Sequence, residues 1–78
     1  MEDDELTEKL DLSGLNCPLP VLKTKKRLSS MSSGGKILVI STDQGSFDDF
    51  KYFCDYSGHK LVSRERKGDK ICFLIERK

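Results

Sequence analysis

The chain has 78 residues, of which 36% are hydrophobic and 35% charged, and its formal net charge is +1. This length allows one small hydrophobic core and excludes two, and a net charge near zero excludes a general attraction to nucleic acid. The longest aliphatic run covers residues 37–40, far fewer than the roughly 20 residues of a membrane span. Because the amino terminus is acidic where a signal peptide would be basic and apolar, we expect a soluble, cytoplasmic protein without membrane contact.

The first residues predict a tail, a strand and a turn. Residues 1–8 are polar, acidic and without periodicity, so we predict a flexible tail ahead of a single domain over residues 9–78. Residues 9–12 alternate between polar and apolar side chains, which predicts a short strand. Ser13 and Gly14 then predict a turn.

A basic, amphipathic helix is predicted from residue 18 to about residue 31. Apolar side chains recur there at helical spacing, and Lys23, Lys26 and Arg27 gather on the opposite side. The Ser-Ser-Gly-Gly sequence of residues 32–35 is expected to end this helix, because glycine readily accepts left-handed backbone angles.

The middle of the chain predicts a central strand and a second helix. Residues 36–42 are rich in Ile and Val without clean alternation, as in a strand that is buried for much of its length. Ser46 is expected to cap a helix over residues 47–57, with Asp49 completing a capping-box-like pair. Gly58 is expected to end this helix.

The last two segments, residues 59–66 and 70–77, predict a β-hairpin around Gly68 and Asp69. The element order is therefore βαβαββ. A right-handed crossover makes the first two strands parallel, and the short loop makes the last two antiparallel. We predict an α+β fold: a two-layer α/β sandwich in which two helices cover one face of a mixed four-stranded sheet.

The last strand is apolar on both of its faces. One face carries Cys72 and Leu74, and the other carries Ile71, Phe73 and Ile75. Because the helices cover one face of the predicted sheet, one of these two sets should meet solvent or a partner.

Cys17 stands directly in front of a proline-rich helix start. The residue before a proline is pushed toward extended backbone angles, so we predict Cys17 at the N-cap, Pro18 at the first helical position and Pro20 at the third. The N–H of Leu19 and the positive end of the helix dipole would then face the sulfur. Both favour the thiolate, so we predict that Cys17 has a lowered pKa and is a nucleophile at the rim of the domain.

Other roles for this cysteine are weighed against that one. Cys17 could be only an incidental N-cap, with the prolines marking the helix start. A dithiol oxidoreductase is disfavoured because no second cysteine stands two or three residues away, and a hydrolase pair with His59 has no local signature. A structural metal would need about four ligands and is not predicted. A lone thiolate without base or cofactor is best suited to accepting a sulfur atom and passing it on.

The segment from Asp11 to Pro20 reads D-x-x-G-L-x-C-P-x-P, which resembles the signature of the small TusA/SirA-like sulfur carrier proteins. The similarity covers nearly the whole chain after the acidic tail. Further residues that match the family pattern are Thr42, Asp43, Asp49, Gly58 and His59, together with the strand at residues 73–75. Gln44 and Lys51 stand where the best-known members have prolines, and Asn16 where some have arginine.

The resemblance implies a βαβαββ sandwich in which Cys17 accepts sulfur as a persulfide from a donor such as a cysteine desulfurase and hands it to an acceptor protein. In tRNA-thiolation relays the acceptor is a further carrier, and other members are implied to serve sulfur oxidation, molybdenum-cofactor or selenium pathways. No cofactor is implied. Direct contact with nucleic acid is not expected, because the basic residues lie on one short helix without interleaved aromatic side chains.

The predicted site extends beyond the cysteine itself. Gly14 and Asp43 are candidates for a site loop, in which Asp43 either orients the neighbouring loop or caps it. The basic residues Lys23, Lys26 and Arg27 are either simply solvated or dock an acidic partner surface. Supporting residues of the helix start are Pro18, Leu19 and Pro20.

Cys54 and Cys72 are expected to act as small hydrophobic side chains rather than as partners of Cys17. The alternative to a sulfur carrier is a regulatory or protein-interaction module, in which Cys17 is only a structural helix cap.

Overall fold

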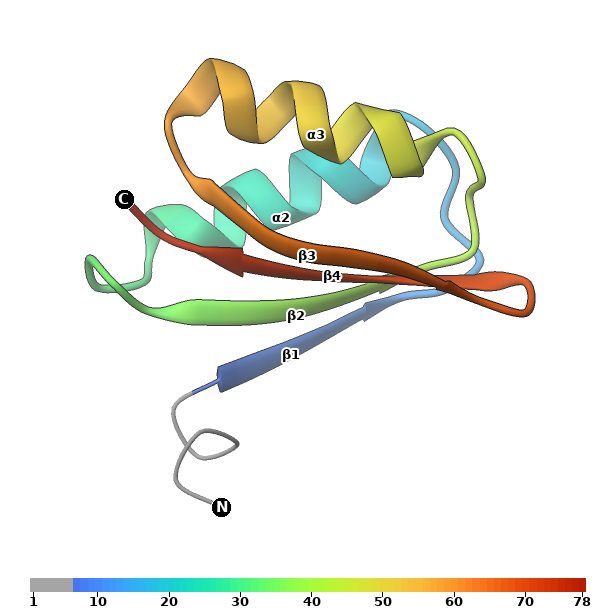
Figure 1. Cartoon of the computed structure of the whole chain (residues 1–78), viewed down its shortest axis with the longest axis horizontal. Coiled ribbons are helices and arrows are strands. Elements are labelled where there is room, and N and C mark those ends of the chain that lie inside the picture. Colours follow the sequence, from blue (N-terminus) through green and yellow to red (C-terminus); the bar gives the residue numbers. More distant parts are fainter. Residues whose placement is uncertain (1–6) are drawn as a thin grey trace.

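The computed structural model describes residues 7–78, and the chain order of its elements confirms the predicted βαβαββ arrangement (Figure 1). The strands are β1 (Thr7–Leu12), β2 (Lys36–Ser41), β3 (Lys60–Lys67) and β4 (Lys70–Glu76), and the helices are α2 (Leu19–Ser29) and α3 (Ser46–Ser57). Neither helix in the described part of the chain is long and apolar enough to cross a membrane.

The four strands form one mixed sheet in the order β1-β2-β4-β3. Strand β2 pairs in parallel with β1 and antiparallel with β4, and β3 pairs antiparallel with β4. Both helices lie on the same face of this sheet (Figure 1). The predicted two-layer α/β sandwich is therefore confirmed, with β2 as a central strand because the crossover through α2 returns the chain beside β1.

The core lies between the helices and the covered face of the sheet. Ile37 and Val39 of β2 pair with Ile75 and Phe73 of β4, and all four side chains are fully buried. Phe50 of α3 packs on Phe73 with the ring centroids 4.4 Å apart. Burying such side chains is the main favourable contribution to the stability of a domain this small.

The opposite face of the sheet carries the second apolar set of β4. Ile71, Phe73 and Ile75 are buried under the helices, whereas Cys72 and Leu74 are partly exposed on the uncovered face. The register extends this uncovered set onto β2, because Leu38 pairs with Leu74 and Ile40 pairs with Cys72. The set that meets solvent is therefore Cys72 and Leu74.

Two boundaries differ from the predicted ones by more than one residue. Strand β1 begins at Thr7, so Thr7 and Glu8 belong to the sheet, and the rest of the predicted tail lies outside the described residues. Helix α2 ends at Ser29 rather than near residue 31. The hydroxyls of Ser29 and Ser30 donate to the carbonyl oxygens of Lys26 and Arg27 at 2.6 and 2.9 Å. Serine hydroxyls compete in this way with the backbone hydrogen bonds that would continue a helix.

The start of α3 also differs from the prediction. Gly45 is the N-cap and no side chain caps the helix, so the predicted capping box of Ser46 and Asp49 is wrong. Ser46 is instead the buried first helical residue, and its hydroxyl donates to the carbonyl oxygen of Asp43 at 2.6 Å. The same hydroxyl lies 3.1 Å from the hydroxyl of Ser41 at the end of β2. Ser46 thus fixes the start of α3 to the end of the central strand, and Asp49 is left available for other contacts.

Candidate functional site

Cys17 lies where β1 and β2 both end. Because these strands are parallel, the loops that follow them meet at one edge of the sheet. The backbone N–H of Gly14 donates to the Thr42 hydroxyl at 2.9 Å, and the N–H of Cys17 donates to Asp43 Oδ2 at 3.0 Å. The predicted site loop of Gly14 and Asp43 is therefore brought together with Cys17, and Asp43 orients the backbone that carries the thiol.

Cys17 does not occupy the predicted N-cap. Helix α2 begins at Leu19, Pro18 is the N-cap, and no side chain donates to or accepts from the first turn. The N–H of Leu19, which was expected to face the sulfur, donates instead to the carbonyl oxygen of Asn16 at 2.9 Å. Pro20 is buried in the first turn and Leu19 is exposed. The interpretation of Cys17 as a structural helix cap is therefore wrong as well.

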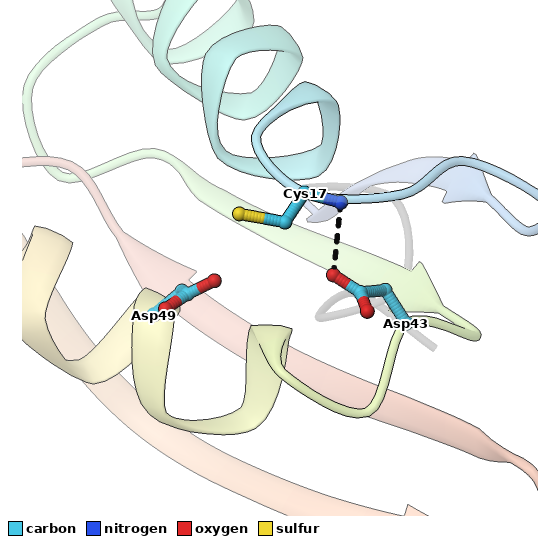
Figure 2. A group of neighbouring side chains, drawn as sticks. All are labelled: Cys17, Asp43 and Asp49. Atoms are coloured by element: carbon cyan, nitrogen blue, oxygen red, sulfur yellow. Dashed lines mark hydrogen bonds between the residues drawn. The ribbon is translucent and has the colours of Figure 1, made fainter.

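Two carboxylates surround the Cys17 sulfur. The Cys17 sulfur lies close to one carboxylate oxygen of Asp43 and one of Asp49, and all three atoms are within 4.8 Å of one another. Figure 2 shows the Cys17 side chain reaching toward α3, where the Asp49 carboxylate points toward it, while Asp43 lies below the Cys17 backbone nitrogen. Helix α3 supplies Asp49 from its first turn, and the loop after β2 supplies Asp43.

These carboxylates raise the pKa of the Cys17 thiol. The largest cause is the hydrogen bond between the thiol and Asp49, followed by partial loss of solvent and by the negative charges of Asp49 and Asp43. A thiol that donates to a carboxylate is stabilised in its protonated form, and nearby negative charge disfavours the thiolate. The predicted lowering of this pKa is thus wrong, because the fold brings the carboxylates of Asp49 and Asp43 close to the sulfur.

The same three groups are the one cluster of His, Cys, Asp or Glu in residues 7–78 that is compact enough to share a metal ion. Its cysteine is exposed and its two carboxylates are partly exposed. Three ligands at an exposed rim fall short of the closed four-ligand set of a structural zinc site. Their arrangement instead sets the charge around an exposed thiol.

An open groove of about 480 Å³ starts at the cysteine. Cys17 and Asp49 lie in it together with Tyr52, Phe53 and Tyr56 of α3. The remaining lining residues are Pro18 and Val21. Tyr56 is 94% exposed and Tyr52 is 67% exposed, which is unusual for large aromatic side chains in a domain with so small a core. The groove therefore offers a partner an aromatic surface directly beside the thiol.

Sequence reasoning did not identify this aromatic surface or the role of Asp49. The signal was present, because residues 49, 52, 53 and 56 are spaced three and four apart and so share one helix face. What the spacing could not show is that this face of α3 turns toward Cys17.

The predicted docking residues lie elsewhere. Lys23, Lys26 and Arg27 are exposed and line a separate groove of about 400 Å³ with Leu10 of β1. Arg27 also pairs with Glu8, and its Nε donates to Glu8 Oε1 at 2.7 Å. The structure therefore does not bring this basic set into the groove of Cys17.

The other candidate nucleophiles and bases are separated from Cys17 as well. Cys54 is buried in the core and Cys72 lies on the uncovered sheet face. His59 follows the far end of α3, whose last residue, Ser57, lies about 12 Å along the helix axis from Asp49 at ~1.5 Å per residue. Its Nδ1 accepts the backbone N–H of Lys78 at 3.2 Å. Cys17 is therefore a lone thiol.

Comparison with known proteins agrees with this geometry. The chain matches the family described as sulfurtransferase TusA over residues 8–77. It is 47% identical over 73 residues to the sulfur carrier protein TusA of Allochromatium vinosum, covering 94% of this chain and 96% of that protein. A putative sulfur carrier protein of Neisseria meningitidis is 38% identical, covering 92% of this chain and 97% of that protein.

A solved structure extends the similarity to three dimensions. The SirA-like protein from Desulfitobacterium hafniense superposes with a TM-score of 0.76 at 25% sequence identity, covering 87% of this chain and 93% of that one. Sequence and fold therefore agree with the predicted resemblance. The chain belongs to the sulfurtransferase TusA family.

Proposed function

We propose that this protein is a sulfur carrier, in which Cys17 takes up a sulfane sulfur as a persulfide and hands it to an acceptor protein. The observation that carries the proposal is the lone, exposed thiol of Cys17 beside an open groove. The names of its relatives as sulfur carriers support the same role. Because the described chain places no second cysteine in this groove, the sulfur must leave to another molecule.

The transfer needs only a nucleophile, access and a leaving thiolate. The Cys17 sulfur attacks the terminal sulfur of the donor's hydropersulfide, so that an S–S bond forms on Cys17 while the donor's own S–S bond breaks. The donor cysteine keeps the electron pair of the broken bond and takes up the proton that Cys17 gives up. Cys17–SH and donor–S–SH thus become Cys17–S–SH and donor–SH, and no oxidant, reductant or cofactor is consumed.

The groove is the part of the surface that a partner would contact. A donor such as a cysteine desulfurase and an acceptor protein must each bring a sulfur to Cys17, so both would use this face in turn. Exposed aromatic side chains such as Tyr52 and Tyr56 are typical of protein interfaces. A tRNA-thiolation relay is one pathway that such a carrier would serve.

The test is the intact mass of the protein after incubation with a cysteine desulfurase and cysteine. We expect a gain of about 32 Da per sulfur atom that a reductant removes. The gain should be absent in Cys17→Ser and retained in Cys72→Ser, which removes the partly exposed cysteine of the other sheet face. Persistence of the gain in Cys17→Ser, or no gain with any desulfurase tried, would contradict a carrier role for Cys17.

A further inference from the structure

We propose that Asp49 is a positioning residue that destabilises the persulfide of Cys17 relative to the free thiol, so that the loaded protein transfers its sulfur readily to an acceptor. This inference rests on the proposed carrier function and adds the direction in which sulfur transfer is favoured, which is from Cys17 to an acceptor. A carboxylate oxygen of Asp49 lies within 4.8 Å of the Cys17 sulfur, which is the atom that gains and loses the transferred sulfur, and the carboxylate points toward it (Figure 2).

The charge of Asp49 is left uncompensated by the rest of the fold. Helix α3 carries three aspartates, and Asp48 pairs with Arg64 at 3.3 Å while Asp55 pairs with Lys51 at 2.9 Å. Among residues 7–78, no lysine or arginine forms an ion pair with Asp49. Its carboxylate is directed at the Cys17 sulfur instead (Figure 2).

The other groups that face the sulfur do not cancel this charge. Asp43, from the loop after β2, adds a second carboxylate to the cluster. Tyr52 and Tyr56 of α3 line the groove with phenol rings and not with basic side chains. From α2 and its entry come the apolar Pro18 and Val21. The environment of the sulfur is therefore negative on balance.

This environment affects the empty and loaded forms differently. The empty thiol is neutral at pH 7 and can donate its proton to Asp49, so the carboxylate stabilises it. A hydropersulfide is more acidic than a thiol, so there is a pH range in which the loaded form carries negative charge on its terminal sulfur while the empty thiol is still neutral. Two nearby carboxylates disfavour that anion. The equilibrium Cys17–S–SH plus acceptor–SH to Cys17–SH plus acceptor–S–SH is thereby shifted toward the acceptor.

The experiment measures how much sulfur Cys17 retains at equilibrium. The full chain is incubated with N-acetylcysteine methyl ester and its persulfide, an exchange couple without carboxylate or ammonium groups, and the loaded fraction is read from the intact mass at a series of pH values. Because the fraction is read at equilibrium, any effect of Asp49 on the rate at which the small molecule approaches does not alter it. The variants are Asp49→Asn, which keeps the shape, Asp49→Glu, which keeps the charge, and Asp55→Asn as a matched loss of charge on the same helix.

Asp49→Asn should be loaded several-fold more than wild type near neutral pH, with Asp55→Asn matching wild type and Asp49→Glu returning toward it. The difference should close at low pH, where the persulfide is protonated. It should also close above the pKa of the thiol, where both forms are anionic. Equal loading of Asp49→Asn and wild type at every pH, an equal shift at every pH, or the same shift in Asp55→Asn would each overturn the proposal.

A second measurement separates this inference from the carrier function. The rate of Cys17 alkylation by iodoacetamide against pH reports the thiol of the empty protein and needs no sulfur donor. We expect its midpoint to move to lower pH in Asp49→Asn and to stay unchanged in Asp55→Asn. If no desulfurase loads Cys17 but this midpoint moves, the carrier function fails while the influence of Asp49 on the thiol stands. If desulfurase loading succeeds and the midpoint does not move, the inference about Asp49 fails alone.

Discussion

Helix α3 affects two thiols in different ways. It carries Cys54 on its buried face, and it presents Asp49 to Cys17, which precedes α2. Both pKa values are raised. Burial raises the pKa of Cys54 to about 11, with a smaller effect from the charge of Asp55. Cys17 is exposed, and its pKa is raised mainly by Asp49. Burial makes a thiol inert, whereas a carboxylate beside an open thiol leaves it reachable by a partner.

The sharpest test of this comparison is alkylation of the native protein. Cys54 is 2% exposed, so iodoacetamide can reach it only when the structure opens. Cys17 should react more than about a hundredfold faster than Cys54, because opening of a core helix is rare. Peptide mapping after timed exposure measures both rates, and unfolding in urea should bring them together. Comparable rates in the native state would contradict the placement of Cys54 in the core.

Two matched substitutions should separate the stability of the protein from its sulfur transfer, and the first of them lies in the core. Phe50→Ala removes a fully buried ring that packs on Phe73, and we expect it to cost about 3–5 kcal/mol of unfolding free energy, as for other buried aromatic side chains. Urea denaturation measures this loss. A cost below 1 kcal/mol would mean that the two helices do not pack on the sheet as described.

The matched change at the rim is Tyr56→Ser. The Tyr56 side chain is almost fully exposed, so its loss should leave the unfolding free energy within about 0.5 kcal/mol of wild type. If partners use the groove, the same change should slow loading by a desulfurase several-fold, since aromatic anchors carry much of the energy of protein interfaces. Tyr56→Ser with wild-type loading would place the partner contact elsewhere on the surface.

The fold followed from the sequence because its signals are local. Glycines and serines separate segments whose hydrophobic periodicity is clear, and a short hairpin with one crossover leaves few topologies. The errors were also local in origin. Ser30 ends α2 by bonding to Arg27 before the glycines are reached, and Ser46 becomes buried rather than acting as a cap. Hydroxyl groups that choose among several backbone partners are hard to assign from a sequence.

The site was only half predictable. Cys17 was found because two prolines mark its position, but the charge at its sulfur was predicted with the wrong sign. That charge comes from Asp43 and Asp49, which reach the cysteine only through the pairing of β1 with β2 and the placement of α3. The basic residues close in sequence lie along a different groove. Contacts between segments far apart in the chain decide the pKa, and no local pattern contains them.

Asp43 offers a way to separate its charge from its hydrogen bond. Asp43→Asn removes the charge but retains an oxygen that can accept the Cys17 N–H, so we expect near-wild-type stability and a Cys17 alkylation midpoint at lower pH. Asp43→Ala removes both and should also cost about 1 kcal/mol of unfolding free energy, the usual contribution of a hydrogen bond. Equal stability of the two variants would show that the Asp43 to Cys17 bond does not hold the loop.

The smallest expected effect lies at the far end of α3 and depends on pH. Burial, followed by the charges of Lys78 and Arg77, lowers the pKa of His59 below its ordinary value of 6.5. On acidification the unfolded chain therefore binds a proton before the folded protein does. The stabilising contribution of neutral His59 is complete above the ordinary pKa and is lost as the pH falls through the lowered one.

This pH dependence has a structural cause that a substitution can isolate. Neutral His59 accepts the backbone N–H of Lys78 through Nδ1, and protonation removes that acceptor while adding positive charge beside two cations. His59→Asn keeps an acceptor in a similar place but does not titrate. Thermal unfolding midpoints measured from about pH 8 down to about pH 5 should therefore fall more steeply for wild type than for His59→Asn. Parallel curves would mean that the carboxylates alone set the acid sensitivity and that the carboxyl-terminal contact to His59 contributes little.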